Sequence, residues 1–303
     1  MKFRFWGVRG SIPSPGPRTA RYGGNTTCIE VRLDDGTLIV LDAGTGLFPL
    51  AQQLLKDGAA VDANIFITHS HWDHIHGLPF FTPLFVKGSR VCLYGAYDQT
   101  SGRGIEHVMA VQLQNSYFPV DEAQMAATIA YRTLEVGVPV TVGQATLSNV
   151  VMNHPVLNLG YRIECRGRSL FFTGDHEPWH NPHPPGDPRR RAVDAHLAER
   201  ERAVDAVMAG VDALVVDCSY TIDEYPARAG WGHGTFDGAI ALALRVGARA
   251  LYGTHHEPTR SDDELEAAFA DVLARHAGQL SGLQVHLAYE GLEVFLGPAP
   301  EPA

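Results

Sequence analysis

Alternating apolar and polar residues predict short β-strands from the N-terminus onward. Residues 3–8, 26–33 and 37–41 show this pattern, and Asp34-Asp35-Gly36 between the last two predicts a hairpin turn. Residues 63–68 are apolar on both faces, which is typical of a strand covered on both sides. The same criteria predict further strands at 90–94, 146–152, 159–165, 169–173, 213–217 and 248–253, and a closing hairpin at 283–296.

Helical periodicity occurs between several of these strands. The predicted helices are 46–57, 190–209, 235–247 and 261–277. Residues 97–133 could form a helical insert or a flap, and 178–210 is a second candidate insert, because its proline-rich first part, 178–188, cannot form a regular element. The tail 297–303 is expected to be frayed.

The order of these elements predicts an α/β protein. Two strand-rich halves, each closed by helices, favour two mixed sheets packed face to face with helices outside, in one domain over residues 1–303. A doubly wound parallel sheet is the alternative. Parallel strands need long crossover connections, so the many tight-turn signals argue against it.

Composition narrows the range of partners. The 303 residues include 24 Lys and Arg against 34 Asp and Glu, a formal net charge of −10, so no extended nucleic-acid surface is expected. No signal peptide or membrane-spanning segment is visible, and the four widely spaced cysteines are expected to be reduced thiols. These features predict a cytoplasmic protein without a membrane partner, and a homodimer is compatible with them.

The most informative chemistry follows the apolar strand 63–68. His69 and His71 can point at one position, and Asp73 and His74 at a second position nearby. Imidazole and carboxylate groups are the ligands that suit zinc and similar divalent ions. Three other predicted strands also end in candidate ligands, namely His154, Asp175 and His255. Brought together, these residues would form a two-metal site.

At this signature the sequence resembles the metallo-β-lactamase superfamily. The pattern His-x-His-x-Asp-His at 69–74 is preceded by Leu41-Asp42-Ala-Gly and followed, in the family's order, by His154, Thr173-Gly-Asp175 and Thr254-His255. The resemblance covers about residues 3–296. It implies an αββα sandwich with two divalent metal ions at one edge between the sheets, zinc being the first choice and manganese or iron the alternatives.

The family's motifs imply a role for each of these residues. By position, the first metal would be held by His69, His71 and His154, and the second by Asp73, His74 and His255. Asp175 would bridge both ions, and Asp42 would orient a ligand without binding metal. His256 is the alternative ligand at the last strand, whereas His76 is expected outside the ligand set.

Two positions disfavour other branches of the family. Penicillin-cleaving members generally have a cysteine near the position of Asp175, and the di-iron oxygen-reducing relatives have a glutamate at the position of His71. The resemblance therefore implies hydrolysis by a metal-bridging hydroxide, acting on phosphodiesters, thioesters or lactones. A metal-binding sensor without turnover is the non-enzymatic alternative, which the complete ligand set disfavours.

A further motif favours phosphodiesters. Gly232-His233-Gly-Thr235 resembles the Gly-His-Ser-Thr motif of the tRNA 3′-processing and phosphodiesterase branch, in which the histidine lies beside the phosphate; the serine is glycine here. Residues 5–13 and 22–26 also resemble a small-phosphodiesterase subgroup, where Gly23 and Gly24 would let backbone N–H groups approach an anion. Asp73 and His233 are the catalytic candidates, and Asp73 is a metal ligand as well.

The sequence thus predicts a dinuclear-metal-dependent hydrolase whose favoured substrate is a small phosphodiester such as a cyclic nucleotide. In the tRNA-processing branch a basic, glycine-rich arm holds long substrates, whereas the second candidate insert has one basic cluster, Arg189-Arg190-Arg191. The alternatives are a lactonase or thioesterase of the same fold and a tRNA- or RNA-processing nuclease.

Overall fold

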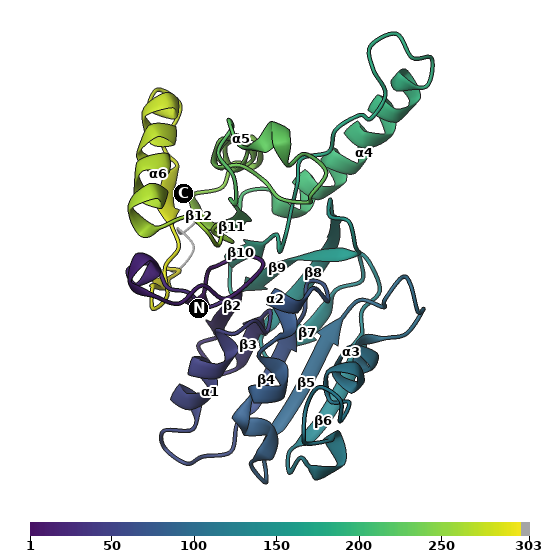
Figure 1. Ribbon diagram of the computed structural model, residues 1–303, viewed down its shortest axis with the longest axis vertical. Coiled ribbons are helices and arrows are strands. Elements are labelled where there is room, and N and C mark those ends of the chain that lie inside the picture. The colour runs from purple at the N-terminus through teal and green to yellow at the C-terminus, as the bar shows by residue number, and fades with distance from the viewer. Residues whose placement is uncertain (298–303) are drawn as a thin grey trace.

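Two seven-stranded β-sheets form the centre of the computed structural model, which describes residues 1–297 (Figure 1). The first sheet contains β1 (Lys2–Gly7), β2 (Cys28–Arg32), β3 (Leu38–Leu41), β4 (Asp62–Phe66), β5 (Arg90–Gly95), β6 (Thr128–Thr133) and β14 (Glu293–Phe295). The second contains β7 (Val140–Val142), β8 (Ala145–Met152), β9 (Asn158–Cys165), β10 (Arg168–Phe172), β11 (Ala213–Asp217), β12 (Ala250–Thr254) and β13 (Gln284–Leu287). The expected frayed tail lies, from residue 298 onward, outside the described residues.

The two sheets have the same pattern of strand directions. Their orders are β14-β1-β2-β3-β4-β5-β6 and β13-β12-β11-β10-β9-β8-β7. In the first sheet β3 to β6 run parallel, in the second β10 to β13 do so, and the other pairs are antiparallel. The mixed sheets confirm the predicted sandwich and exclude the single doubly wound sheet.

Helices cover the outer face of each sheet, and apolar side chains fill the space between the sheets. The first sheet carries α1 (Leu47–Leu54), α2 (Trp72–Ile75) and α3 (Ile105–Gln112); the second carries α4 (Arg190–Met208), α5 (Phe236–Val246) and α6 (Asp262–His276). The core between the sheets combines residues such as Phe5 and Phe66 from the first with Tyr161 and Phe172 from the second. This is the αββα arrangement.

Local sequence explains where the outer helices α5 and α6 begin and where α5 ends. The hydroxyl of Thr235 accepts a hydrogen bond from the Gly238 N–H at the start of α5, and Gly247 ends that helix in the left-handed conformation. Ser261 and Glu264 form a capping box at the start of α6. These signals explain why the predicted helices 235–247 and 261–277 agree closely with the structure.

Three parts of the structure differ from the sequence-based expectation. Residues 97–133 contain α3 and the edge strand β6, which pairs with β5, and β7 was not predicted. The closing hairpin at 283–296 is wrong: β13 pairs in parallel with β12, whereas β14 pairs with β1 in the other sheet. The apolar pattern of these strands indicated extended backbone, but it carried no information on which sheet each strand joins.

The second candidate insert forms an irregular loop and the helix α4, which extends away from the body (Figure 1). In α4 only Val204 and Met208, near its C-terminal end, are buried. Along residues 1–297, no helix is long and apolar enough to cross a membrane. The four cysteines form no disulfide, and Cys92 is half-buried rather than buried.

Candidate metal centre

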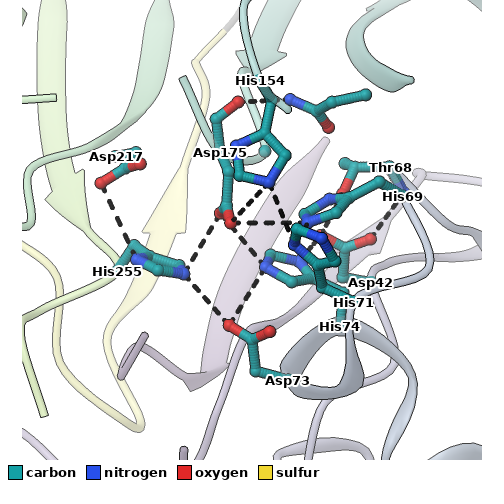
Figure 2. A network of polar contacts seen from close by, with 12 residues as sticks. Asp42, Thr68, His69, His71, Asp73, His74, His154, Asp175, Asp217 and His255 are labelled. Carbon is teal, nitrogen blue, oxygen red and sulfur yellow. Dashed lines mark hydrogen bonds and ion pairs between the residues drawn. The ribbon is translucent and has the colours of Figure 1, made fainter. Parts of the chain in front are cut away.

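The ends of four strands meet at one edge of the sandwich and bring the candidate ligands together. His69 to His74 follow β4, and His154, Asp175 and His255 follow β8, β10 and β12 (Figure 2). The carboxyl ends of the parallel strands in both sheets point to this edge, so side chains that are distant in sequence converge there. All seven sequence-predicted ligands lie in two clusters of four that could hold a metal ion and that share Asp175.

The first cluster combines three imidazoles with one carboxylate oxygen. Nδ1 of His71 lies 3.0 Å from Nε2 of His69 and 3.0 Å from Nε2 of His154. Oδ2 of Asp175 lies 3.5 Å from Nε2 of His69 and 3.8 Å from Nε2 of His154. Four donor atoms therefore surround one small space.

The second cluster contains two carboxylates and two imidazoles. Oδ2 of Asp73 lies 3.3 Å from Nε2 of His74 and 3.1 Å from Nε2 of His255. Oδ1 of Asp175 lies 3.1 Å and 3.2 Å from the same two nitrogens. The two oxygens of Asp175 thus face different clusters, as a carboxylate between two cations would.

Two of these atoms lack the partners that buried polar groups normally have. Nε2 of His74 and Oδ1 of Asp175 are buried and make no hydrogen bond within residues 1–297. Such orphaned atoms are costly unless an ion or another group satisfies them. The residues present therefore fit a pair of bound metal ions.

Asp42 fixes the orientation of His74 by binding Nδ1, the ring nitrogen that faces away from the second cluster, as the family resemblance implied. Its carboxylate accepts hydrogen bonds from the Thr68 N–H (2.7 Å), the Thr68 hydroxyl (2.8 Å) and Nδ1 of His74 (2.6 Å). Nδ1 of His74 therefore carries its proton, and Nε2 faces the second cluster with its lone pair. Asp42 itself has a positive φ of 60°, a strained backbone conformation that sequence patterning does not indicate.

Asp217 and Ser219 are functional candidates that the sequence analysis missed. Asp217, at the end of β11, accepts hydrogen bonds from Nδ1 of His233 (2.8 Å) and from the hydroxyl of Ser219 (2.8 Å). The oxygen of that hydroxyl lies 2.9 Å from Nδ1 of His255. The signal that identified the other ligands, a polar residue directly after an apolar strand, would have identified Asp217 too.

The four buried carboxylates of the centre are balanced by histidines. Within residues 1–297, the ion-pair partners of Asp42, Asp73, Asp175 and Asp217 are imidazoles, with no lysine or arginine among them. Burial lowers the pKa of His255, but Asp175 and Asp217 outweigh this effect and raise the pKa to about 9. The raised pKa reflects the negative charge of the carboxylates around His255, which bound divalent cations would neutralise.

The N-terminal loop touches the second cluster through a backbone group. The N–H of Ser11 donates to Oδ2 of Asp73 at 2.7 Å, and Ser11 has a positive φ of 59°. The loop is held by Arg9, whose fully buried guanidinium donates to the carbonyls of Gly23 (2.8 Å) and Arg260 (2.9 Å) and to the carboxylate of Asp262 (2.9 Å). In the same loop, the N–H of Gly23 donates to the carbonyl of Thr19 at 2.8 Å.

Two other histidines nearby, His256 and His76, lie outside the two clusters. His256 is buried on another side, where Nε2 donates to the carbonyl of Ala288 at 2.8 Å. His76 is absent from the clusters that could hold a metal among the described residues, and its ring packs 5.2 Å from that of Trp72. His255 is therefore the histidine of this strand end that faces the centre.

Comparison with known proteins agrees with this geometry. The model of the β-lactamase superfamily domain matches residues 37–256, well over half of the chain. The chain belongs to the β-lactamase superfamily. This membership confirms the resemblance found at 69–74 and identifies the protein as a metallo-hydrolase of that superfamily.

The chain is similar along nearly its whole length to several known proteins. Ribonuclease Z of Haloarcula marismortui is 24% identical over 97% of this chain and 96% of its own length. The short form of human tRNase Z has a TM-score of 0.64 at 18% identity, covering 98% of this chain and 100% of that structure. Unliganded yeast PDE1 has a TM-score of 0.67 at 16% identity, covering 97% and 99%. The two structural likenesses show a shared fold.

Proposed function

We propose that the chain is a dinuclear-metal-dependent phosphodiesterase. His69, His71 and His154 would hold one divalent ion, and Asp73, His74 and His255 the other, with one oxygen of Asp175 toward each. Zinc is the first choice, because imidazole and carboxylate donors in a buried site suit it, and manganese and iron are the alternatives. The positions of the two Asp175 oxygens support this assignment.

Two bound ions would make a hydroxide nucleophile available near neutral pH and would place positive charge beside the phosphoryl oxygens. The protein's own groups fix the arrangement. Asp42 holds the tautomer of His74, and Ser219 contacts the outer nitrogen of His255. The N–H of Ser11 donates to Oδ2 of Asp73 and so helps to keep this ligand in place.

The pair formed by His233 and Asp217 is the single observation that carries the assignment to phosphodiesters. Asp217 accepts the hydrogen bond from Nδ1 of His233, so Nε2 is left to donate a proton. Burial lowers the pKa of His233, but Asp217 and Asp175 outweigh it and raise this pKa above its ordinary value. Nδ1 of this imidazole lies 3.8 Å from Oδ2 of Asp175, so the ring lies beside the metal centre. A protonated imidazole at this position can protonate a departing alkoxide, a contribution of about 10²–10⁴ in rate.

A small diester such as a cyclic nucleotide is the proposed substrate. The net charge of −10 disfavours a long polyanion. Within the basic cluster at the start of α4, Arg189 is paired with Asp187 at 2.7 Å. An RNA-processing nuclease is the second candidate, which the likeness to Ribonuclease Z along 97% of the chain favours.

A substrate panel tests the proposal. Zinc-reconstituted protein is assayed on 3′,5′- and 2′,3′-cyclic nucleotides, bis-p-nitrophenyl phosphate, a tRNA precursor with a 3′ trailer, a lactone and a thioester. We expect the highest kcat/KM on a cyclic nucleotide. Turnover of the precursor alone would favour the nuclease, and turnover of the lactone or thioester alone would contradict the phosphodiesterase.

His233→Ala tests the proton donor, with His76→Ala as a matched control. Both variants should keep the metal content of the wild type. His233→Ala should lose about 10²–10⁴ in kcat on cyclic nucleotides, whose leaving group needs a proton, and much less on bis-p-nitrophenyl phosphate. Equal losses on both substrates would argue that His233 only binds the phosphate.

A further inference from the structure

Glu177 is a buried carboxylate that no step of the proposed mechanism uses. Its side chain is 3% exposed and accepts three hydrogen bonds from one loop. The donors are the hydroxyl of Tyr225 (2.6 Å) and the backbone N–H groups of Gly230 (2.7 Å) and Gly232 (2.8 Å). The one basic group in ion-pair range within residues 1–297 is the half-exposed ring of His180, 3.9 Å away. Hydrogen bonds from residues 225–232 therefore stabilise the buried charge.

This loop lies directly against a candidate metal ligand. The carbonyl of Gly232 accepts a hydrogen bond from Nδ1 of His154 at 2.9 Å. Gly232 has a positive φ of 90°, and a Cβ at this position would lie 2.3 Å from Nδ1 of His154. The backbone thus approaches the imidazole as closely as a glycine allows, and the next residue is His233.

We propose that Glu177 is a positioning residue that holds the loop 225–232 against His154. The hydrogen bond to Gly232 keeps the proton of His154 on Nδ1, so that Nε2 faces His71 and Asp175 with its lone pair. Because His233 follows Gly232, the hydrogen bonds between this loop and Glu177 also set the distance between His233 and the metal centre. The inference rests on the proposed function for the role of His233 and the metal ligands.

Glu177 is tied to the centre on its other side as well. It is two residues from Asp175, and its N–H donates to the carbonyl of Asn153, the neighbour of His154, at 3.0 Å. A carboxylate suits the position because it accepts hydrogen bonds with both oxygens. In Glu177→Gln one oxygen can still accept from Tyr225 and Gly230, but the amide NH₂ then faces the N–H of Gly232. The contact nearest to His154 is therefore lost.

The experiment compares Glu177→Gln with Tyr225→Phe, which removes one hydrogen bond and leaves both backbone contacts. Trypsin cleavage after Arg228, followed by mass spectrometry on chelator-treated protein, measures opening of the loop without any turnover. We expect Glu177→Gln to speed this cleavage about tenfold or more, because a lost bond to a charged acceptor raises the open population. Tyr225→Phe also loses one bond to the charged carboxylate but keeps both backbone contacts, so it should speed the cleavage clearly less than Glu177→Gln does.

Zinc competition and kinetics give the second readout. Glu177→Gln should lower the affinity for one of the two zinc ions by about 10–100-fold, the usual effect of removing a partner that orients a ligand. On bis-p-nitrophenyl phosphate its kcat should fall while KM changes little. If Glu177→Gln does not fold, Glu177→Asp, whose carboxylate is too short to span all three donors, should show the same changes to a smaller extent.

The inference is overturned if trypsin cleaves Glu177→Gln at the wild-type rate and the variant binds zinc with wild-type affinity. Equal changes in cleavage and zinc affinity in Tyr225→Phe would also overturn it, because the phenol of Tyr225, rather than the N–H groups of Gly230 and Gly232, would then hold the loop. Neither cleavage nor zinc affinity depends on the substrate. A protein inactive on every diester that still shows both effects would refute the proposed function and leave the role of Glu177 standing.

Discussion

Arg9→Met tests how the N-terminal loop is held against the metal centre. Arg9 and Asp262 form an ion pair whose side chains are 0% and 4% exposed. Methionine replaces part of the apolar stem of Arg9 but leaves Asp262 without its cation and two carbonyls without a donor. Removing one partner of a buried pair costs about 3–5 kcal/mol. With an unfolding entropy of about 0.6 kcal/mol/K for a chain of this length, we expect Tm to fall by about 5–8 °C.

The assay is thermal unfolding followed by circular dichroism, at one scan rate because large proteins often unfold irreversibly. Asp262→Asn keeps an oxygen for the N–H of Arg21, which donates to Asp262 at 2.7 Å, and should lose a similar amount. The double variant carries no unpaired charge. It should therefore be more stable than the sum of the single effects predicts, by about 2 kcal/mol. Strictly additive losses, or single variants with an unchanged Tm, would refute this account of the loop.

Three further outcomes follow from the metal centre and the surface. Removing metal with a chelator should lower Tm, and added zinc should restore it, because an ion that binds only the folded state stabilises it; an unchanged Tm would contradict the proposed ligation. Asp175→Ala should lose at least one metal equivalent and the activity together in elemental analysis, whereas His76→Ala should keep both metals. Burial raises the pKa of Asp237, but Arg275 and His276 outweigh it and lower the pKa overall. The folded state then binds fewer protons than the unfolded one below about pH 4, so the stabilisation by Asp237 is full at pH 7 and is lost as the pH falls further. Asp237→Asn should therefore lower Tm at pH 7, and this loss of Tm should become smaller as the pH is brought below about 4.

The sequence was most informative where local pattern and burial agree. The strand at 63–68 is apolar on both faces because it lies inside a covered parallel sheet, and this position made the histidines after it conspicuous. The same strand-end logic located His154, Asp175 and His255 correctly at the edge of the sandwich. Asp217 ends the predicted strand 213–217 and fits the same rule, but it was not among the predicted site residues.

Local sequence patterns did not predict which strands pair when the strands are far apart in the sequence. The strand β6 lies at a sheet edge and all of its residues are half-buried or exposed, so it lacks the buried apolar residues that mark the central strands. The strands β13 and β14 are close in sequence but belong to different sheets. Glu177 precedes a proline-rich stretch that lacks any regular pattern, and only the positions of Gly230 and Gly232 in space reveal what it binds.

The distribution of the ligands between the two sheets has a consequence for any attempt to divide the protein. Among residues 1–297, the chain passes between the sheets at 134–139 and again at 288–292. A cut in the first connection yields two fragments, and each cluster then takes two members from either fragment: His69 and His71 with His154 and Asp175, and Asp73 and His74 with Asp175 and His255. The C-terminal fragment also carries β14, which must pair with β1 of its complement. Neither fragment alone contains either of these two clusters, whereas the third candidate group, Asp175, Asp217, His233 and His255, lies wholly in the C-terminal fragment. Uptake of two metal ions in such a split system would therefore report that both halves had reassembled.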